Sequence, residues 1–379
     1  MPAVPVLRTA PEFPERQRPA HVQALPRPEA LCQAKSLAFL MFDKRDLRQA
    51  QRFWQDFGLS TVSLTEGRLV MRAAGAAPAV LVAHRARRSR YVGAAFVVSD
   101  DTDLAALQRV SGGEALPSGA IPGGGQGLRL RDPDGHEVWL LQRWGRVDPL
   151  PEPEPLSNQM NTLSQVRRVN ATVRSPIAPA RVGRLGHVVL QTTDFHAMSQ
   201  WYMRHLGLIP TDVQYLPDGS PMLTFFRLNL GDQPADHHTV VVAGGIECRY
   251  EHSAWEVADL DALGQGQQVL RANGHRHMWG IGRHVLGSQL FDYWHDADGM
   301  EFEHYTDGDL FTAEHETRYV PFSTSSIWAW GDDVPASMFP KKSLATLWKV
   351  LRLLRSGRMG LDRLRLMGGV ADQPARPWL

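Results

Sequence analysis

Two long stretches of this chain repeat one pattern of residues, and this repeat limits the folds open to it. Residues 37–59 align without gaps with residues 186–208, so that Gly58 corresponds to Gly207, 207 − 58 = 149 positions later. Each copy predicts a strand, then a helix begun by an Asp and carrying aromatic residues, then a Leu-Gly pair that ends the helix. An internal duplication of this size is interpreted before any single motif.

The repeat extends to a second pair of stretches. "LRLRDPDGHEVWLLQ" aligns with "LFDYWHDADGMEFEHY", with Asp132 matched to Asp296 at an offset of 164. Each is typical of a β-hairpin, in which two alternating strands flank a tight D-x-D-G turn. Between the paired stretches, "YVGAAFVVSDDTDLAALQRV" and "YEHSAWEVADLDALGQGQQVL" each begin another strand and Asp-capped helix. The chain is therefore predicted to be α+β, built from tandem βαβββ modules.

Composition places the boundaries of these modules. Residues 1–30 are proline-rich without periodicity and predict a disordered tail. Residues 31–145 and 181–310 hold the two copies, and 146–180 has the composition of a linker. In the extension 311–379, leucines recur at helical spacing among Lys and Arg. They predict a basic amphipathic helix that packs on the body or on a second subunit, with contact to a membrane surface as the alternative.

Charge and cysteine content exclude several classes of function. Lys and Arg number 41 against 40 Asp and Glu, which gives no electrostatic reason to expect nucleic acid as a partner. No apolar run reaches the ~18 residues that a membrane-spanning helix needs. The N-terminal stretch lacks the apolar core of a secretory signal. Cys32 and Cys248 form neither a metal motif nor a disulfide pattern, which favours a reducing compartment and hence the cytoplasm.

The two copies differ at the positions where chemistry is expected. Where the second copy has His187 the first has Ala38, and where the second has Glu303 the first has Trp139. Of the fifteen histidines, eleven lie between residues 187 and 304. We therefore expect two domains, of which the first is structural and the C-terminal one is catalytic.

Three residues on three predicted strands form a candidate metal site. His187 and His252 each sit in a strand, and Glu303 lies on the outgoing strand of the second hairpin. Two imidazoles and one carboxylate leave adjacent coordination positions open, which suits non-haem Fe(II) better than Zn²⁺. Spacing alone does not separate Glu303 from Glu301, because both point to the same face of the strand. A single histidine such as His187 in an apolar strand is otherwise more often a core residue.

The stretch "GIGRHVLGSQLFDYWHDADGMEFEHY", residues 280–305, resembles the signature of type I extradiol ring-cleavage dioxygenases. These belong to the vicinal oxygen chelate superfamily, with glyoxalase I and the bleomycin-resistance proteins. The resemblance covers roughly residues 35–310. It implies the vicinal oxygen chelate fold, with His187, His252 and Glu303 as ligands of Fe(II), or of Mn(II) as the alternative.

The same resemblance implies roles for three more residues. His284, in the Gly-x-x-Arg-His segment, would act as acid or base. Tyr293 would hydrogen-bond a substrate oxygen, and His237 would help to position substrate and O₂, with the adjacent His238 left open as the residue in that role. If they have no catalytic role, His284 would be an ordinary loop residue and His237 a surface residue at the end of a strand. Six further histidines receive no role: His196, His205, His275, His277, His295 and His304.

The resemblance implies cleavage of a catechol-type diol beside its hydroxyl groups, with O₂ as co-substrate and a homo-oligomer as the usual assembly. Two other classes stay open: a non-oxidative metal-dependent lyase or isomerase of the superfamily, and a protein that sequesters a ligand without turnover. The aromatic-rich stretch after Asp309 is a candidate cover for the mouth of the site. The sequence does not identify the diol.

Overall fold

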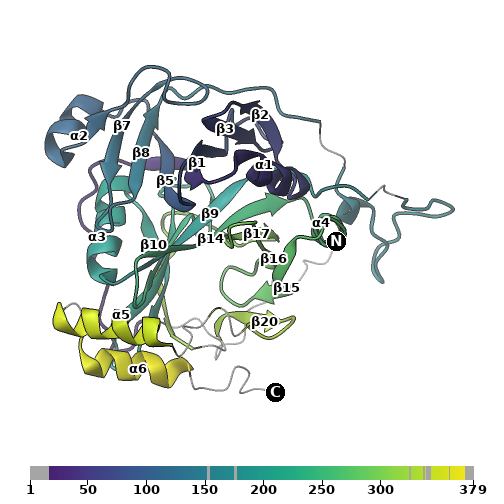
Figure 1. Cartoon of the computed structure of the whole chain (residues 1–379). Helices are drawn as coiled ribbons and strands as arrows, with labels where there is room; N and C mark the ends of the chain where they lie inside the picture. The colour runs from purple at the N-terminus through teal and green to yellow at the C-terminus, as the bar shows by residue number, and fades with distance from the viewer. Residues whose placement is uncertain are drawn as a thin grey trace.

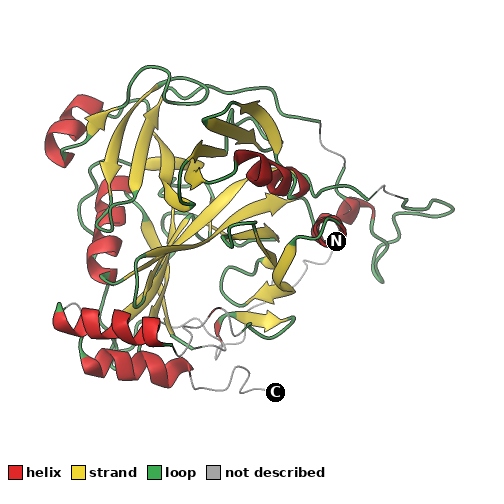
Figure 2. Cartoon of the chain, viewed as in Figure 1, coloured by secondary structure: helices red, strands yellow, loops and turns green. Residues whose placement is uncertain are grey.

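The protein is described from a computed structural model that covers residues 17–151, 154–174, 177–323, 326–335, 338, 343–357 and 359–371 (Figure 1). Two large β-sheets dominate it, and helices pack against their faces (Figure 2). The first sheet has eight strands and the second has ten. Each sheet is built by one copy of the sequence repeat, which we call the first module (β1–β8) and the second module (β9–β17).

The first module follows the predicted βαβββ order twice. Its sheet order is β2-β3-β4-β1-β5-β8-β7-β6, so the antiparallel pair of β1 and β5 joins the two halves. The elements run β1 (Ala34–Lys44), α1 (Leu47–Asp56), β2 (Ser60–Leu64), β3 (Arg68–Arg72), β4 (Leu81–Arg85), β5 (Arg90–Val98), α2 (Leu104–Ser111), β6 (Glu114–Ala115), β7 (Gln126–Arg131) and β8 (Glu137–Gln142).

The second module repeats this arrangement around the antiparallel pair of β9 and β14. Its elements run β9 (Val182–Thr192), α3 (Phe195–Leu206), β10 (Ile209–Tyr215), β11 (Pro221–Arg227), β12 (Ala235–Asp236), β13 (Val240–Gly244), β14 (Arg249–Val257), α4 (Leu260–Ala272), β15 (Arg276–His284), β16 (Leu290–His295) and β17 (Glu301–Thr306). The sheet order is β19-β10-β11-β13-β9-β14-β17-β16-β15-β20. The predicted α+β fold of tandem βαβββ modules is confirmed.

Short polar residues begin the helices as the sequence predicted. The Asp46 carboxylate accepts hydrogen bonds from two backbone N–H groups at the start of α1, and Asp194 accepts one at the start of α3. Gly207 ends α3 with φ of +66°, in the left-handed region where a side chain would be strained. The Leu-Gly pair therefore fixes where β10 begins after the helix.

The duplicated D-x-D-G turn has the same hydrogen bonds in both modules. Asp132 Oδ1 accepts backbone N–H groups from two and four residues later at 3.0 and 2.9 Å, and Asp296 Oδ1 does the same at 2.9 and 3.0 Å. The second oxygen of each Asp reaches the other module. Tyr202 of α3 donates to Asp132 at 3.3 Å, and Lys44 of β1 forms an ion pair with Asp296. These two turns thus tie the modules together.

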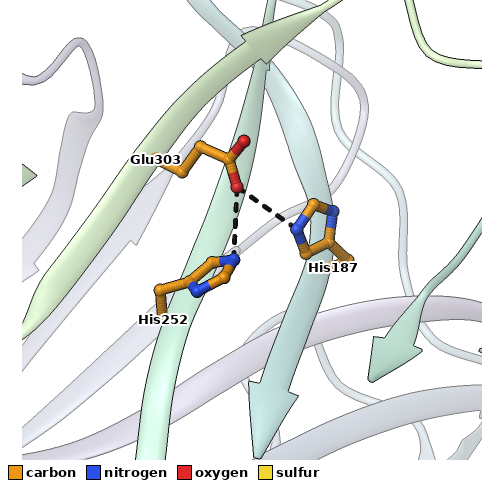
Figure 3. Close-up of side chains that lie close together, drawn as sticks. All are labelled: His187, His252 and Glu303. Carbon is orange, nitrogen blue, oxygen red and sulfur yellow. Dashed lines mark ion pairs between the residues drawn. The ribbon is translucent and has the colours of Figure 1, made fainter. Parts of the chain in front are cut away.

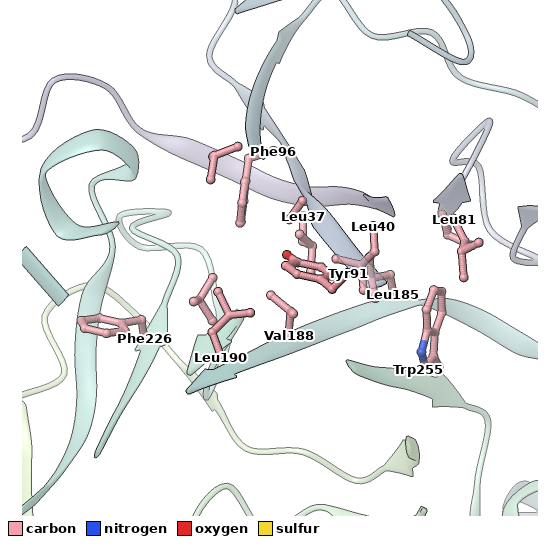
Figure 4. Close-up of a cluster of buried hydrophobic side chains, with 14 of the residues drawn as sticks. Leu37, Leu40, Leu81, Tyr91, Phe96, Leu185, Val188, Leu190, Phe226 and Trp255 are labelled. Atoms are coloured by element: carbon pink, nitrogen blue, oxygen red, sulfur yellow. The ribbon is translucent and has the colours of Figure 1, made fainter. Parts of the chain in front are cut away.

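One cluster of buried apolar side chains runs through both modules (Figure 4). Leu37 and Leu40 of β1 belong to it together with Leu185 and Val188 of β9, and Trp255 of β14 is fully buried in it. Burial of this kind stabilises by roughly 25 cal/mol per Å² of apolar surface. Since the cluster is continuous, the first module supports the strands that carry the candidate site.

The N-terminal region differs from the predicted disordered tail over residues 1–30. Residues 1–16 lie outside the described residues, but 17–30 run along the second module. Val22 and Leu25 are buried in the shared core, and Gln23 N–H donates to Gly219 O at 2.9 Å. The prolines prevent regular structure, yet a few apolar side chains are enough to fix the segment in place.

The C-terminal region forms two helices where one was predicted. They are α5 (Leu344–Arg355) and α6 (Leu361–Ala371), and Gly357 between them has φ of +69°. Val370 of α6 is buried against the second module, whereas α5 exposes an apolar stripe that includes Trp348. Across the described residues, none of the helices combines the length and the hydropathy that a membrane span requires.

Further short elements complete the chain. β12 pairs with β18 (Leu310–Phe311), while β19 (Arg318–Pro321) and β20 (Trp328–Trp330) extend the two edges of the ten-stranded sheet. Within the predicted linker 146–180, the described residues form a single 3₁₀ turn, η1 (Leu156–Gln159).

Candidate metal centre

Three neighbouring strands place the predicted ligands on one face of the second sheet (Figure 3). Ala254 of β14 pairs with His187 on β9 and with Glu303 on β17. His252 lies two residues before Ala254, so its side chain points to the same face of β14. Strand pairing therefore brings together His187, His252 and Glu303, of which the first and last are 303 − 187 = 116 positions apart in sequence.

The ligand atoms lie at distances suited to one ion. Glu303 Oε2 is 3.3 Å from His187 Nε2 and 3.3 Å from His252 Nε2, and one donor atom from each residue lies within 4.8 Å of the others. Two ligands about 2.1 Å from a metal, at angles between octahedral and tetrahedral, are about 3.0–3.4 Å apart. The two separations between the Glu303 carboxylate and the imidazole nitrogens match this geometry.

Glu303 also shows that the site suits a cation. Its side chain is fully buried, and neither carboxylate oxygen has a hydrogen-bond partner of good geometry among the described residues. A buried carboxylate without donors is costly unless a cation compensates it. Two imidazoles and one carboxylate are ligands that Fe(II) and Mn(II) accept. The residues present therefore fit a divalent metal ion.

The electrostatics keep the ligands in the protonation states that bind metal. Burial tends to raise the pKa of Glu303, but the imidazoles of His187, His252 and His284 outweigh it and hold this pKa well below its usual range. Burial lowers the pKa of His187, so its ring is neutral. An ionised carboxylate with neutral imidazole is the state that metal coordination requires.

Glu301, the alternative left open by spacing, has a different environment. It is half-buried and lines a cavity of about 340 Å³ together with Tyr250 and Glu251. Burial, opposed in part by His252, raises the pKa of Glu301 to about 7. The two histidines converge on Glu303, so the structure favours Glu303 over Glu301 as the third ligand.

His284 and Tyr293 lie beside the three ligands. His284 Nδ1 is 2.8 Å from the Ile327 carbonyl, which can only accept, so Nδ1 carries the hydrogen. In the neutral ring Nε2 is then an acceptor, and it receives the Tyr293 hydroxyl at 3.0 Å. Nε2 is also 3.5 Å from Glu303 Oε1. Burial raises the pKa of Tyr293 well above its usual value, so Tyr293 is a phenol that donates.

The aromatic-rich stretch after Asp309 contributes to this arrangement through its backbone. β20 pairs with the end of β15, with Trp328 opposite His284, and Trp328 is fully buried against Trp279. The neighbouring Ile327 supplies the carbonyl that orients His284. Sequence reasoning missed this contact because any residue type can supply a backbone carbonyl.

Of the two adjacent histidines, His238 lies next to the candidate metal centre. The centroid of its ring is 4.0 Å from that of His187. His237 points away, and its Nε2 is 2.6 Å from Asp212 Oδ2. Of the pair left open by the sequence, His238 is thus the one nearer to the candidate centre, and the two rings stay in contact, with their Nδ1 atoms 2.9 Å apart. Sequence reasoning also missed Asp212, although an acid inside the apolar run "LIPTDVQYL" was a signal.

Other histidines of the second module connect the two modules. His304 is fully buried, stacks on Phe57 at 3.7 Å, and donates from Nε2 to the Phe57 carbonyl at 2.7 Å. His275 Nε2 is 2.8 Å from the Asp56 carboxylate at the end of α1. The concentration of histidine in this module thus has structural as well as chemical causes.

The corresponding positions of the first module are apolar. Ala38 packs with Phe39, Met41 and Leu141 in a separate buried cluster, and Trp139 packs against it. Trp139 Nε1 donates to Glu137 at 2.9 Å. The first module therefore lacks the polar groups that the second module presents at the same positions.

Comparison with known proteins supports the resemblance to extradiol dioxygenases and their superfamily. The sequence model of the Glyoxalase/Bleomycin resistance protein/Dioxygenase superfamily matches residues 184–304, which contain all three candidate ligands. Metapyrocatechase 2 of Cupriavidus necator is 28% identical over 291 residues, which cover 76% of this chain and 87% of that relative.

Solved structures share the fold. Homoprotocatechuate 2,3-dioxygenase of Brevibacterium fuscum, in its anaerobic complex with 3,4-dihydroxyphenylacetate, superposes with a TM-score of 0.66 at 18% identity, covering 83% of this chain and 94% of that chain. The Mn(II)-bound glyoxalase of Novosphingobium aromaticivorans superposes with a TM-score of 0.66 at 20% identity, covering 82% and 96%. Residues 184–304 of this chain therefore match the glyoxalase, bleomycin resistance protein and dioxygenase superfamily, and the resemblance to extradiol dioxygenases that the sequence suggested is confirmed.

Proposed function

We propose that this protein is an extradiol ring-cleavage dioxygenase, which opens a catechol-type ring beside its two hydroxyl groups and adds both atoms of O₂. One observation carries the proposal: His187, His252 and Glu303 converge on one face of three adjacent strands, with His284 and Tyr293 beside them. The similarity to metapyrocatechase 2 supports the same reaction class.

His187, His252 and Glu303 would hold a divalent ion, and a set of only three protein ligands would leave room for substrate and O₂ to bind it. Bound there, Fe(II) would hold the diol and O₂ side by side and transfer electron density between them. Mn(II) is the alternative ion, since the same ligand set accepts both. One positive charge would remain after the Glu303 carboxylate is counted, which favours a diol that has lost at least one proton.

The protein side chains then orient the diol and handle its protons. Tyr293 is a neutral phenol, and its hydroxyl hydrogen, which His284 Nε2 accepts in this structure, would turn to the substrate oxygen that loses its proton when a diol binds. His284, whose Nδ1–H is held by the Ile327 carbonyl, would then have Nε2 free to act as acid or base during ring opening. His238, beside His187, would contact substrate from another side of the centre. The product is a ring-opened hydroxymuconic semialdehyde.

A second candidate function is a non-oxidative, metal-dependent lyase or isomerase of the same superfamily. The similarity in fold to a Mn(II)-bound glyoxalase favours it. Such a reaction needs a base and a Lewis acid but no O₂. Dependence on O₂ therefore separates the two candidates.

Three further points belong to the same proposal. The partners are a catechol-type small molecule and O₂, without nucleic acid. Assembly into a homo-oligomer is proposed from the superfamily resemblance. A reducing cytoplasm is proposed because Cys32 and Cys248 are both free thiols.

The test uses protein purified anaerobically with ferrous iron. A panel of catechols, including 3-substituted and biaryl diols, is added before O₂, and both O₂ uptake and a new yellow absorbance are followed. We expect stoichiometric uptake and a yellow product, both lost in Glu303→Ala and retained in the matched control Glu301→Ala. Bound iron without O₂ uptake on any diol would contradict the proposal, and absence of bound metal would contradict the ligand set.

A further inference from the structure

Behind His238, a buried row of polar groups leads away from the candidate metal centre. His238 Nδ1 is 2.9 Å from His237 Nδ1, and His237 Nε2 is 2.6 Å from Asp212 Oδ2. All three side chains are almost fully buried. Backbone hydrogen bonds hold the segment in place, since His237 N–H donates to Asp309 O at 2.8 Å and Thr239 N–H donates to Phe226 O at 2.7 Å.

The two ring contacts restrict where hydrogens can lie. An ionised carboxylate only accepts, so His237 carries a hydrogen on Nε2 that it donates to Asp212. Two nitrogens 2.9 Å apart share one hydrogen, so one Nδ1 donates and the other accepts. If His237 is neutral, its Nδ1 accepts and His238 carries its hydrogen on Nδ1. The Nε2 of a neutral His238 is then an unprotonated acceptor.

Asp212 has other ionisable neighbours besides His237. Arg227 is fully buried, donates to backbone carbonyls, and interacts with the Asp212 charge. Burial lowers the pKa of Arg227 to about 10, and Asp212 opposes this decrease. Burial also lowers the pKa of His315, a further neighbour of His237. Asp212 therefore has a cationic neighbour in Arg227 in addition to its contact with His237.

The position of His238 completes the path. The His238 ring lies against His187. Its Nδ1 contacts His237, and its Nε2 forms no hydrogen bond with the residues that the structure describes. His237 has the Asp212 carboxylate 2.6 Å from its Nε2, whereas the only ring nitrogen contact of His238 among the described residues is with His237.

We propose that Asp212 and His237 are positioning residues that fix which ring nitrogen of His238 carries hydrogen, and that together they hold the proton a bound diol releases. The inference rests on the proposed function, because it assigns the destination of a proton from a catechol-type substrate.

A substrate hydroxyl gives its proton to His238 Nε2, while His238 Nδ1–H passes to His237 Nδ1. The diol is left one unit more negative, His238 is neutral with its hydrogen on Nε2, and His237 is an imidazolium paired with Asp212. The reverse transfer returns the proton to the product. His238 changes from acceptor to donor without ever keeping a charge next to the metal ligands.

The test follows the ionisation of a bound diol rather than turnover. A nitro-substituted catechol, whose visible absorbance reports how many protons it has lost, is titrated anaerobically against the iron-loaded protein from acid to alkaline pH. Asp212→Asn keeps the shape of the side chain and removes its charge. His237→Gln keeps an acceptor for His238 Nδ1–H but takes up no proton. The matched control is Asp56→Asn, which changes another Asp–His pair, with His275 at 2.8 Å.

We expect wild type and Asp56→Asn to ionise the bound catechol at the same pH. In Asp212→Asn the midpoint should move to higher pH by about one unit, a tenfold weaker proton acceptor, and in His237→Gln by at least as much. Iron content, and diol affinity measured at a pH below both midpoints, should stay within a factor of about three, which a merely structural role would not preserve together with the shift. Unchanged midpoints in both variants would overturn the inference. A wild-type protein that holds iron but leaves the catechol un-ionised would overturn the proposed function, and this inference with it.

Discussion

Lys44 is a buried cation of the first module whose charged partners all lie in the second. Its side chain is fully buried, forms an ion pair with Asp296, and lies 3.4 Å from Asp298 Oδ2. The ammonium also lies 5.5 Å from the Phe42 ring centroid. The hairpin that holds both Asp residues leads directly into β17, which carries Glu303. Replacing Lys44 by Met therefore tests how the first module supports the candidate site.

The expected loss of folding stability comes from the Asp296 carboxylate, which the substitution leaves without its cation. Lys44→Met keeps the length of the side chain but leaves the Asp296 carboxylate buried without its cation, and breaking such a pair typically costs about 3–5 kcal/mol. Two backbone N–H groups still donate to Asp296 Oδ1, so we expect the lower end, about 3 kcal/mol. Adding Asp296→Asn removes the stranded charge. The double variant should therefore be less destabilised than the sum of the two single variants by about 2 kcal/mol or more.

The assay is urea unfolding of metal-free protein, with the double-mutant cycle completed by the two single variants. Arg45→Met is the matched control, because Arg45 pairs with Asp298 at 3.1 Å in the same hairpin but is 66% exposed. An exposed pair of this kind contributes less than about 1 kcal/mol. The reasoning would be refuted if Lys44→Met cost no more than Arg45→Met, or if the cycle proved additive.

Three other predictions follow from the site and its supports. Glu303→Gln should lose bound iron, measured by metal analysis, whereas Glu301→Gln should retain it. Tyr293→Phe should keep iron but lower kcat by about 10²-fold, because a positioned hydroxyl is removed, and unchanged kcat would contradict its role. Burial lowers the pKa of His304 to about 4, so only the unfolded chain takes up this proton as pH falls from about 6.5 to 4. Stability is lost across that window, by about 3 kcal/mol from this residue. His304→Gln, which can still donate to the Phe57 carbonyl, should show a correspondingly flatter pH dependence of urea unfolding.

Much of the fold was predictable because the duplication carries its own hydrogen bonds. The Asp of each D-x-D-G turn makes the same pair of backbone contacts, and the Asp-capped helices begin where the sequence placed them. The N-terminal segment and the C-terminal helices were less predictable. Val22 and Leu25 are anchored by tertiary burial alone, which proline-rich composition conceals. The break between α5 and α6 depends on the left-handed backbone of Gly357 within a continuous apolar periodicity.

The metal ligands and the groups that orient them differ in how visible they are to sequence. His187 and Glu303 differ in chemical type from their counterparts in the first copy, Ala38 and Trp139, so comparing the copies isolates them. The groups that orient the hydrogens of the histidine rings are not revealed by comparing the two copies. Ile327 acts through its carbonyl, and Asp212 reaches the centre only through His237, so neither has a spacing to recognise.

The pair of adjacent histidines, His237 and His238, is another case that sequence alone does not resolve. His237 and His238 are neighbours of the same residue type, so the sequence does not say which of the two rings lies beside the candidate centre. The choice is made by backbone hydrogen bonds to Asp309 and Phe226, far away in sequence. His237 Nε2 lies 2.6 Å from Asp212 Oδ2, so Asp212 reaches the candidate centre only through the rings of His237 and His238. The role proposed for Asp212 therefore depends on contacts that only the three-dimensional structure shows.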